Sequence, residues 1–326
     1  MAHTDLSLAE LGSYRSSVKA PSDVECFWQR TLDEARSFTR PVDLRRVPTG
    51  LSLIDTFDVV FSGFGGHPIR AWYHRPTTAG SDPIGVVVRF QGYGGGRGLA
   101  HQVSHYVLAG YACLEMDTRG QGAGWGPGDT PDPVGSAPSH PGFLTRGILD
   151  PNDYYYRRVF TDAVRAVETV RELPGIDPRR VVVAGMSQGG GICLAVTGLV
   201  DGIAAAMPDV PFLCDFPRAA AIAGGPPYSE IAAYLSVHPN HIGAAFDTLA
   251  YFDATVLSRS AVAPALFSVA LMDQTCPPST VYGAYHSYGG PKEMRTYPFN
   301  DHEGGHVWHE AEQLRWLLDL VPPAPR

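Results

Sequence analysis

The stretch Val181-Val-Val-Ala-Gly-Met-Ser-Gln-Gly-Gly-Gly191 decides the fold that this chain is expected to adopt. Three consecutive valines, Val181 to Val183, predict a buried β-strand, because β-branched residues favour extended backbone. The strand runs into a Gly-x-Ser-x-Gly pattern centred on Ser187, and an apolar run that opens a helix follows. A strand-to-helix turn this tight raises its central side chain above the sheet, and the flanking glycines avoid Cβ clashes. Ser187 is therefore a candidate nucleophile, although the pattern alone also fits an ordinary serine in a glycine-rich turn.

The composition predicts a folded chain with a large core. Of its 326 residues, 44% are hydrophobic and 18% are charged, which excludes extensive disorder. The formal net charge is −8 and no Lys/Arg-rich run occurs, so nothing indicates a nucleic-acid partner or an anionic-membrane surface. Because α/β folds often reach this length around one sheet, we expect a single domain over residues 1–326.

Cysteine usage and the N-terminal sequence bear on the cellular compartment. The five cysteines are odd in number, widely spaced and form no Cys-x-x-Cys pair, which is typical of buried thiols in a reducing compartment. Residues 1–11 lack the basic start and apolar core of a secretory signal. No apolar run approaches the roughly 20 residues that span a bilayer. The sequence therefore predicts a cytoplasmic protein with no membrane partner.

Strand and helix patterns alternate along the chain, which predicts an α/β class fold with a mostly parallel, doubly wound sheet. Two early strands, at residues 56–64 and 69–74, precede this sheet, and Gly65-Gly66 between them predicts a hairpin turn. These leading strands should be antiparallel. The other strands are expected at residues 84–90, 112–116, 181–183, 265–272 and 293–297, and the long helices at residues 153–173 and 308–320.

Three segments lie outside this alternation. Residues 1–40 carry a helical pattern and predict an N-terminal helical extension, with a capping box at Ser22-Asp-Val-Glu25. Residues 123–151 are rich in glycine and proline and predict a long loop, a feature that is usually functional. Residues 201–260 look helical and irregular by turns, and we expect them to form a cap or interface insertion.

Two residues later in the chain meet the requirements for catalytic partners of Ser187. A serine hydroxyl needs a histidine base at neutral pH, and that histidine needs an acid to set its tautomer. In an open α/β sheet such groups lie at the carboxyl ends of strands. Asp273 directly follows one predicted strand, and His302 lies a few residues past another. The order Ser187, Asp273, His302 is that of α/β-hydrolases, so we predict this catalytic triad and the α/β-hydrolase fold.

Both partners have alternatives. Asp273 also suits a purely structural cap of the proline-rich segment after it, and His306 and His309 lie close enough in sequence to compete with His302. His302-Glu-Gly-Gly-His306 matches the His-Glu-x-x-His motif of zinc proteases. That motif needs a continuous helix, which two adjacent glycines disfavour by about 1 kcal/mol each. No convincing third ligand follows, so we expect no metal and no organic cofactor.

An oxyanion hole requires two backbone donors aimed at the same point. The N–H of Gln188 is the first candidate, since it follows the nucleophile directly. The second should come from the glycine-rich loop after the strand that ends at Phe90, and Tyr93 is the preferred donor. This loop does not complete the Gly-x-Gly-x-x-Gly pattern of dinucleotide sites, because the sixth position counted from Gly92 is Arg97.

The motif Arg119-Gly120-Gln121 follows the predicted strand 112–116. An arginine at a strand end could take part in catalysis. A structural role, in which its guanidinium bridges carbonyls or carboxylates of adjacent loops, is the favoured interpretation, because five N–H donors in a planar fork suit that task.

Taken together, these motifs resemble the acetyl xylan esterase/cephalosporin-C deacetylase family, carbohydrate esterase family seven. The similarity extends over nearly the whole chain. The segments that carry it are Gly92 to Gly98, Arg119-Gly120-Gln121, Thr145 to Asp150 with Tyr154 to Tyr156, Gly185 to Gly189, Asp273 ahead of Cys276-Pro-Pro-Ser-Thr280, and His302-Glu303.

The resemblance implies a serine esterase that removes acetyl groups from xylo-oligosaccharides and cephalosporin-like esters. It implies Ser187, Asp273 and His302 as the triad and the N–H groups of Tyr93 and Gln188 as the oxyanion hole. It further implies a cytoplasmic homohexamer with active sites facing an internal cavity.

Two departures from the family pattern affect the surroundings of the site. Met186 stands where glycine is frequent, and His306-Val-Trp-His309 replaces a more neutral stretch. Neither removes a catalytic group. The alternatives to an acetyl esterase are a peptidase or longer-acyl esterase with the same triad, and a binding protein with a vestigial site.

Overall fold

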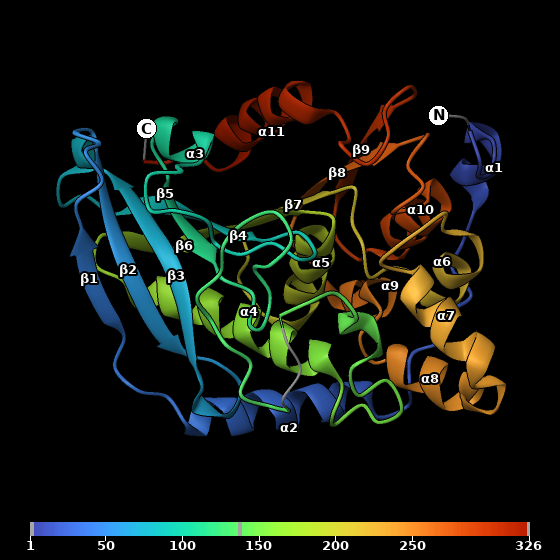
Figure 1. Cartoon of the computed structure of the whole chain (residues 1–326). Helices are drawn as coiled ribbons and strands as arrows, with labels where there is room; N and C mark the ends of the chain where they lie inside the picture. The colour runs from blue at the N-terminus through green and yellow to red at the C-terminus, as the bar shows by residue number, and fades with distance from the viewer. Residues whose placement is uncertain (1–2, 136–138, 325–326) are drawn as a thin grey trace.

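A computed structural model describes residues 3–135 and 139–324 of the chain (Figure 1). Within these ranges nine strands form one sheet in the order β1-β2-β3-β5-β4-β6-β7-β8-β9. The strands are β1 (Asp43–Val47), β2 (Ile54–Ser62), β3 (Pro68–Pro76), β4 (Ile84–Phe90), β5 (Ala112–Met116), β6 (Ile176–Met186), β7 (Ala205–Asp209), β8 (Ala265–Ala270) and β9 (Lys292–Tyr297).

The longer helices pack on the two faces of this sheet or extend beyond it (Figure 1). None of the helices in the described ranges is long and apolar enough to cross a lipid bilayer. The α-helices are α1 (Leu8–Ser13), α2 (Val24–Ser37), α3 (His105–Leu108), α4 (Tyr155–Glu172), α5 (Gln188–Leu199), α6 (Phe216–Ile222), α7 (Ser229–Val237), α8 (Ile242–Leu249), α9 (Ala254–Leu257), α10 (Pro278–Ser287) and α11 (His306–Leu320).

The pairing pattern confirms the expected α/β-hydrolase fold. Strands β1, β2 and β3 pair antiparallel with their neighbours, and β3 joins β5 antiparallel, whereas the pairs from β5 to β9 are parallel. The predicted hairpin closes between Ser62 and Pro68. Gly65 and Gly66 both have positive φ values there, 61° and 71°, a conformation that glycine adopts without a Cβ penalty.

The valines of β6 show how the sequence positions the core. Val181 and Val183 belong to the cluster of buried residues that includes α4 and α5, while Val182 belongs to the cluster on the other face, with residues of α3 and α11. All three are 0% exposed. Because side chains alternate across a strand, a run of valines fills both faces and requires helices on each. This layering holds the carboxyl end of β6, and therefore Ser187, at one edge of the sheet.

The prediction for residues 201–260 needs a correction. This segment contains β7, a strand of the sheet that pairs with both β6 and β8, although its sequence pattern predicts no strand there. The sequence Ala205-Ala-Met-Pro-Asp209 carries no β-branched residue and includes a proline, so its local propensity for a strand is low. Pairing with two neighbours, a tertiary effect, decides its conformation. Whether the helices from α6 to α9 form a cap stays a prediction.

Two further details differ from expectation. The predicted capping box at Ser22 does not form, because α2 begins one residue later, with Asp23 as its N-cap; Ser7 and Glu10 form a capping box on α1 instead. Strand β1 was not predicted at all, since its sequence Asp-Leu-Arg-Arg-Val has only a weak apolar alternation.

Candidate active site

The turn that carries Ser187 has strained backbone geometry. Ser187 lies between β6 and α5 with φ 57° and ψ −120°, a region that costs a non-glycine residue free energy unless its surroundings impose it. Its N–H donates to the Asp209 carbonyl at 2.9 Å, and its own carbonyl accepts from the Phe212 N–H at 2.9 Å. At Gly189 a Cβ would lie 2.1 Å from the Phe90 carbonyl oxygen, so only glycine lets β4 approach this closely. The residues around Ser187 therefore hold its hydroxyl at the edge of the sheet.

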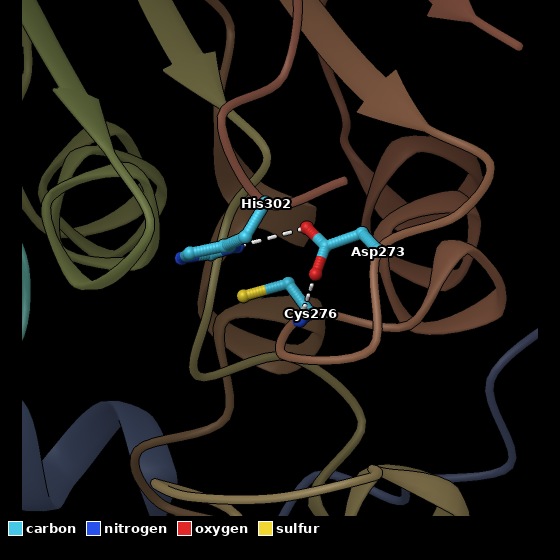
Figure 2. Close-up of side chains that lie close together, drawn as sticks. All are labelled: Asp273, Cys276 and His302. Atoms are coloured by element: carbon cyan, nitrogen blue, oxygen red, sulfur yellow. Dashed lines mark hydrogen bonds and ion pairs between the residues drawn. The ribbon is translucent and has the colours of Figure 1, made fainter. Parts of the chain in front are cut away.

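Three side chains from the ends of three strands form a continuous hydrogen-bonded chain. The Ser187 Oγ lies 2.9 Å from His302 Nε2, and His302 Nδ1 lies 2.9 Å from Asp273 Oδ2. The carboxylate is 1% exposed, and the imidazole is 30% exposed. Figure 2 shows the contact between Asp273 and one edge of the His302 ring. The opposite edge of the ring points away from the carboxylate. A nucleophile, a base and an orienting acid in this geometry can carry out acyl transfer.

The two oxygens of Asp273 have different partners. Oδ1 accepts from the backbone N–H groups of Thr275 and Cys276, both at 2.8 Å, while Oδ2 faces the imidazole. Asp273 thus caps the segment that follows it, which was the structural alternative to a catalytic role. The same carboxylate also contacts His302. Because two backbone donors orient the carboxylate through Oδ1, its second oxygen faces the imidazole.

Burial and charge act in opposite directions on the imidazole. Burial by itself lowers the pKa of His302, but the hydrogen bond and the negative charge of Asp273, with smaller contributions from Asp209 and Asp301, outweigh it and hold this pKa above its ordinary value. The physical cause is the stabilisation of the imidazolium by nearby carboxylates. A raised pKa makes the ring a stronger proton acceptor.

The two backbone N–H groups that the sequence predicts as an oxyanion hole belong to Tyr93 and Gln188. Gln188 is the first residue of α5, and Tyr93 lies on the loop after β4. Among the residues that the structure describes, neither N–H donates a hydrogen bond to a protein group. Tyr93 lines a cavity of about 590 Å³, and Gln188 directly follows Ser187, another of its lining residues; the lining also includes His302, Trp125, Met186, Pro226 and Pro227.

Gln121 of the Arg-Gly-Gln motif connects the two strand-end loops. Its Oε1 accepts from the Gly94 N–H at 2.7 Å, next to Tyr93, and its Nε2 donates to Gln188 Oε1 at 2.9 Å. Gln121 is 3% exposed and Gln188 is fully buried. Gln188 Nε2 also donates to the Gln91 carbonyl at 3.1 Å, so the side chains of Gln121 and Gln188 together tie the two loops that carry the candidate oxyanion donors.

Replacing Gln121 with leucine is expected to lower kcat about 100-fold, because a shift of about 1 Å in a catalytic group costs that much. The variant loses the hydrogen bonds of Gln121 to Gly94, Gln188 and Tyr155, and it leaves the Gly94 N–H unpaired. The effect should fall on kcat more than on KM, and steady-state kinetics on p-nitrophenyl acetate measures both. Gln102→Leu is the matched control, since Gln102 is exposed and accepts only from the nearby Leu99 N–H. Equal kcat values in the two variants would contradict the role of Gln121.

Arg119 and Glu303 lie near the site but contact none of the three side chains. Arg119 is 0% exposed and forms a bidentate ion pair with Asp162 of α4, with NH2–Oδ1 at 2.7 Å. This geometry supports the structural interpretation of the arginine. The helix α4 therefore buries charged side chains as well as apolar ones, among them Asp162 and Arg158. Glu303 is exposed and accepts from Asn300 at 3.0 Å.

The competing histidines occupy other positions. His306 begins α11 and is exposed, with φ 47°. His309 is buried and lies 3.0 Å from the Tyr297 hydroxyl. Because α11 begins only at His306 and Gly304 has a positive φ of 60°, His302 and His306 do not share a helix, as the adjacent glycines predicted. The geometry that a His-Glu-x-x-His zinc site requires is not formed by these residues.

The match to a family decides how this site is classified. The chain matches the family described as Acetyl xylan esterase (AXE1) over residues 1–320. The chain belongs to the acetyl xylan esterase family. It is accordingly a carboxylic ester hydrolase of this type.

Individual relatives of this esterase agree with the family match. An acetyl xylan esterase from Paenibacillus sp. R4 is 35% identical, with a TM-score of 0.89 over 97% of this chain and 100% of that one. Acetyl xylan esterase 1 from Thermoanaerobacterium sp. JW/SL YS485 is 31% identical, with a TM-score of 0.88 over 97% of this chain and 99% of that one. Acetyl esterase Axe7A of Xylanibacter ruminicola is 27% identical over 97% of this chain and 74% of its own length.

Sequence reasoning missed several residues around the site. Asp209 accepts the Ser187 N–H with its carbonyl, but it ends the strand that was not predicted. Trp125 belongs to the long loop, is 65% exposed and lines the cavity. The loop was expected to be functional, but its sequence has no periodicity that indicates which of its residues lines the cavity. Glu230 of α7 accepts from the Tyr93 hydroxyl at 2.7 Å, a contact between segments 137 residues apart in sequence.

Proposed function

We propose that this esterase hydrolyses acetyl esters of xylo-oligosaccharides and of cephalosporin-C-like compounds through an acyl-serine intermediate. The observation that carries the proposal is the hydrogen-bonded chain from Ser187 through His302 to Asp273, which meets a cavity beside two unpaired backbone N–H groups. Membership of the acetyl xylan esterase family supports the acetyl group as the acyl part.

In the proposed acylation step, Ser187 Oγ attacks the acetyl carbonyl carbon while His302 Nε2 accepts the hydroxyl proton. The negative charge that develops on the carbonyl oxygen is stabilised by the N–H groups of Tyr93 and Gln188. Asp273 holds the imidazole in the tautomer with its proton on Nδ1 and stabilises the imidazolium. The tetrahedral intermediate then expels the alcohol, which takes the proton from His302 as it leaves.

In the proposed deacylation step, a water molecule takes the place of the alcohol. His302 accepts a proton from this water, which attacks the acetyl-serine carbonyl, and the same N–H groups stabilise the second oxyanion. Collapse of this intermediate returns the proton to Ser187 Oγ and releases acetate. The cycle consumes one water and regenerates the site without a metal or an organic cofactor.

The substrate preference is the direct test of the proposal. We expect acetate release from acetylated xylo-oligosaccharides and from cephalosporin C, followed by ion chromatography. Among p-nitrophenyl esters, butyryl and octanoyl chains should react at least about tenfold more slowly than acetyl, because a small acyl site discriminates that strongly per misplaced methylene. Equal or faster turnover of octanoyl esters would instead indicate a longer-acyl esterase.

The raised pKa of His302 predicts the pH dependence of kcat/KM. Only the neutral imidazole accepts the Ser187 proton, so the rate should be low below this pKa and should rise with pH through it. Since Asp273 holds the pKa above its ordinary value, the midpoint of the rise should lie above about pH 6.5. A kcat/KM profile on p-nitrophenyl acetate measures it. A rate that increases as pH falls through this region would contradict His302 as the base.

The homohexamer stays a proposal that rests on the family resemblance, and the cytoplasmic location stays one that rests on the resemblance and on the cysteine pattern. Light scattering of the purified protein tests the first, since a hexamer has six times the chain mass of 35.1 kDa.

A further inference from the structure

A buried thiol that the proposed reaction does not use lies beside the Asp273–His302 pair. Asp273, Cys276 and His302 each present one potential metal-ligand atom, and the three atoms lie within 4.8 Å of one another. Figure 2 shows the three side chains gathered together, with the Cys276 sulfur beside the imidazole ring and the Asp273 carboxylate at one end of that ring. Cys276 is 0% exposed. The backbone N–H of Cys276 orients Asp273, but its sulfur has no part in the proposed steps.

The three ligand types match one class of cation. Thiolate, imidazole and carboxylate together are typical of Zn²⁺ sites, whereas Mg²⁺ and Ca²⁺ prefer oxygen ligands. A tetrahedral cation with bonds of about 2.0–2.3 Å holds its ligands roughly 3.5 Å apart. Atoms that already lie within 4.8 Å of one another reach this arrangement through small side-chain movements.

Charge balance also favours a divalent cation here. A thiolate and a carboxylate carry two negative charges and imidazole carries none, so a dication produces a neutral cluster. Neutrality matters because Asp273 and Cys276 are almost fully buried, and an uncompensated charge at such a place is costly. Of the three residues, His302 lines the cavity, so the cluster lies next to a space that solvent reaches.

We propose that thiophilic divalent cations, Zn²⁺ and Cd²⁺, bind among Asp273, Cys276 and His302 Nδ1 and inhibit this esterase. The inhibitory part of the proposal rests on the proposed function of His302 as the base; the binding part does not.

The proton balance of binding explains the inhibition. The Cys276 thiol releases its proton to solvent and becomes a thiolate ligand. His302 Nδ1 offers its lone pair to the cation, so the ring proton that it held moves to Nε2. In that tautomer Nε2 is a donor toward Ser187 Oγ and cannot accept the hydroxyl proton. The cation also occupies the position from which Asp273 orients the ring.

The test measures binding separately from activity. The reference protein is the Cys26→Ser variant, because Cys26 is the exposed cysteine of the chain's five. CdCl₂ is titrated into it while the ultraviolet charge-transfer band of cadmium thiolate and the hydrolysis of p-nitrophenyl acetate are followed. The same titrations are run after adding Cys276→Ala, Cys276→Ser or Ser187→Ala. Cys193→Ser is the matched control, since Cys193 is equally buried but has the Val183 carbonyl as its partner.

We expect the band and the inhibition to appear together at one Cd²⁺ concentration range in the reference protein and in the Cys193→Ser control. Both Cys276 variants should bind Cd²⁺ about 100-fold or more weakly, since losing a ligand costs at least what losing an outer-shell partner does. Each variant's inhibition is compared with its own uninhibited rate. Ser187→Ala should bind Cd²⁺ like the reference protein, although it cannot turn over.

Three results would overturn the proposal: a cadmium–thiolate band that persists in both Cys276 variants, inhibition by Cd²⁺ that is unchanged in them, or equal inhibition by MgCl₂. If the proposed esterase function is wrong, the experiment gives a result that differs from these three. In that case the reference protein would not hydrolyse acetyl esters at all, while the Cys276-dependent band would still report whether the cation site exists.

Discussion

Replacing Ser187 with alanine is expected to lower kcat for acetyl esters by about 10⁶-fold, the loss seen when the nucleophile of such a triad is removed. Without Oγ no acyl-serine forms, and His302 has no hydroxyl to deprotonate. Folding should be intact, because alanine keeps the same Cβ at φ 57° and loses only one side-chain hydrogen bond. Hydrolysis of p-nitrophenyl acetate and the thermal unfolding midpoint measure the two effects.

Ser236→Ala is the matched control for this variant. Ser236 is exposed on α7, and its hydroxyl donates only to the Ala233 carbonyl, so its replacement should leave kcat unchanged. Labelling with an organophosphonate adds an independent readout: the reagent should modify the wild-type protein at Ser187 and leave Ser187→Ala unmodified. Wild-type rates in Ser187→Ala would refute the assignment of the nucleophile.

Replacing Asp273 with asparagine is expected to lower kcat by about 10⁴-fold, as the loss of the orienting acid does in triad enzymes. The backbone N–H groups of Thr275 and Cys276 both donate to Oδ1, at 2.8 Å. The asparagine oxygen must take that position, so its NH₂ group faces His302 Nδ1. Nδ1 then accepts a hydrogen bond and the ring proton moves to Nε2, where it prevents deprotonation of Ser187.

Two measurements distinguish this explanation from a general loss of structure. Nitrogen NMR of the His302 ring should place the proton on Nδ1 in the wild-type protein and on Nε2 in Asp273→Asn. Asp301→Asn is the control. Asp301 accepts the His302 backbone N–H at 2.9 Å, and asparagine keeps that acceptor, so most of the activity should remain. A kcat of Asp273→Asn close to that of Asp301→Asn would contradict the role of Asp273.

The candidate site was predictable from sequence where each residue directly follows a recognisable strand. Asp273 follows the strand β8, and His302 follows β9, so their arrival at the same sheet edge as Ser187 needs only the rule that parallel strands end together. The residues around the cavity were not predictable in this way. Trp125 lies on a loop without periodicity, and Glu230 reaches Tyr93 from a helix that no local pattern links to β4.

The strand–turn–helix at Ser187 and the antiparallel hairpin before the parallel sheet follow from the sequence alone, which also nominates Asp273 and His302 as the partners of Ser187. Local propensity, glycine geometry and alternation of apolar residues carry that information. Four features are visible only in the folded chain: strand β7, the burial of Arg119 against Asp162, the hydrogen bonds of Gln121 between two loops, and the position of Cys276 beside His302. Each of these features depends on contacts between segments that are distant in the chain. For a buried polar group, such contacts outweigh local conformational preference, because burying the group without a hydrogen-bond partner costs free energy.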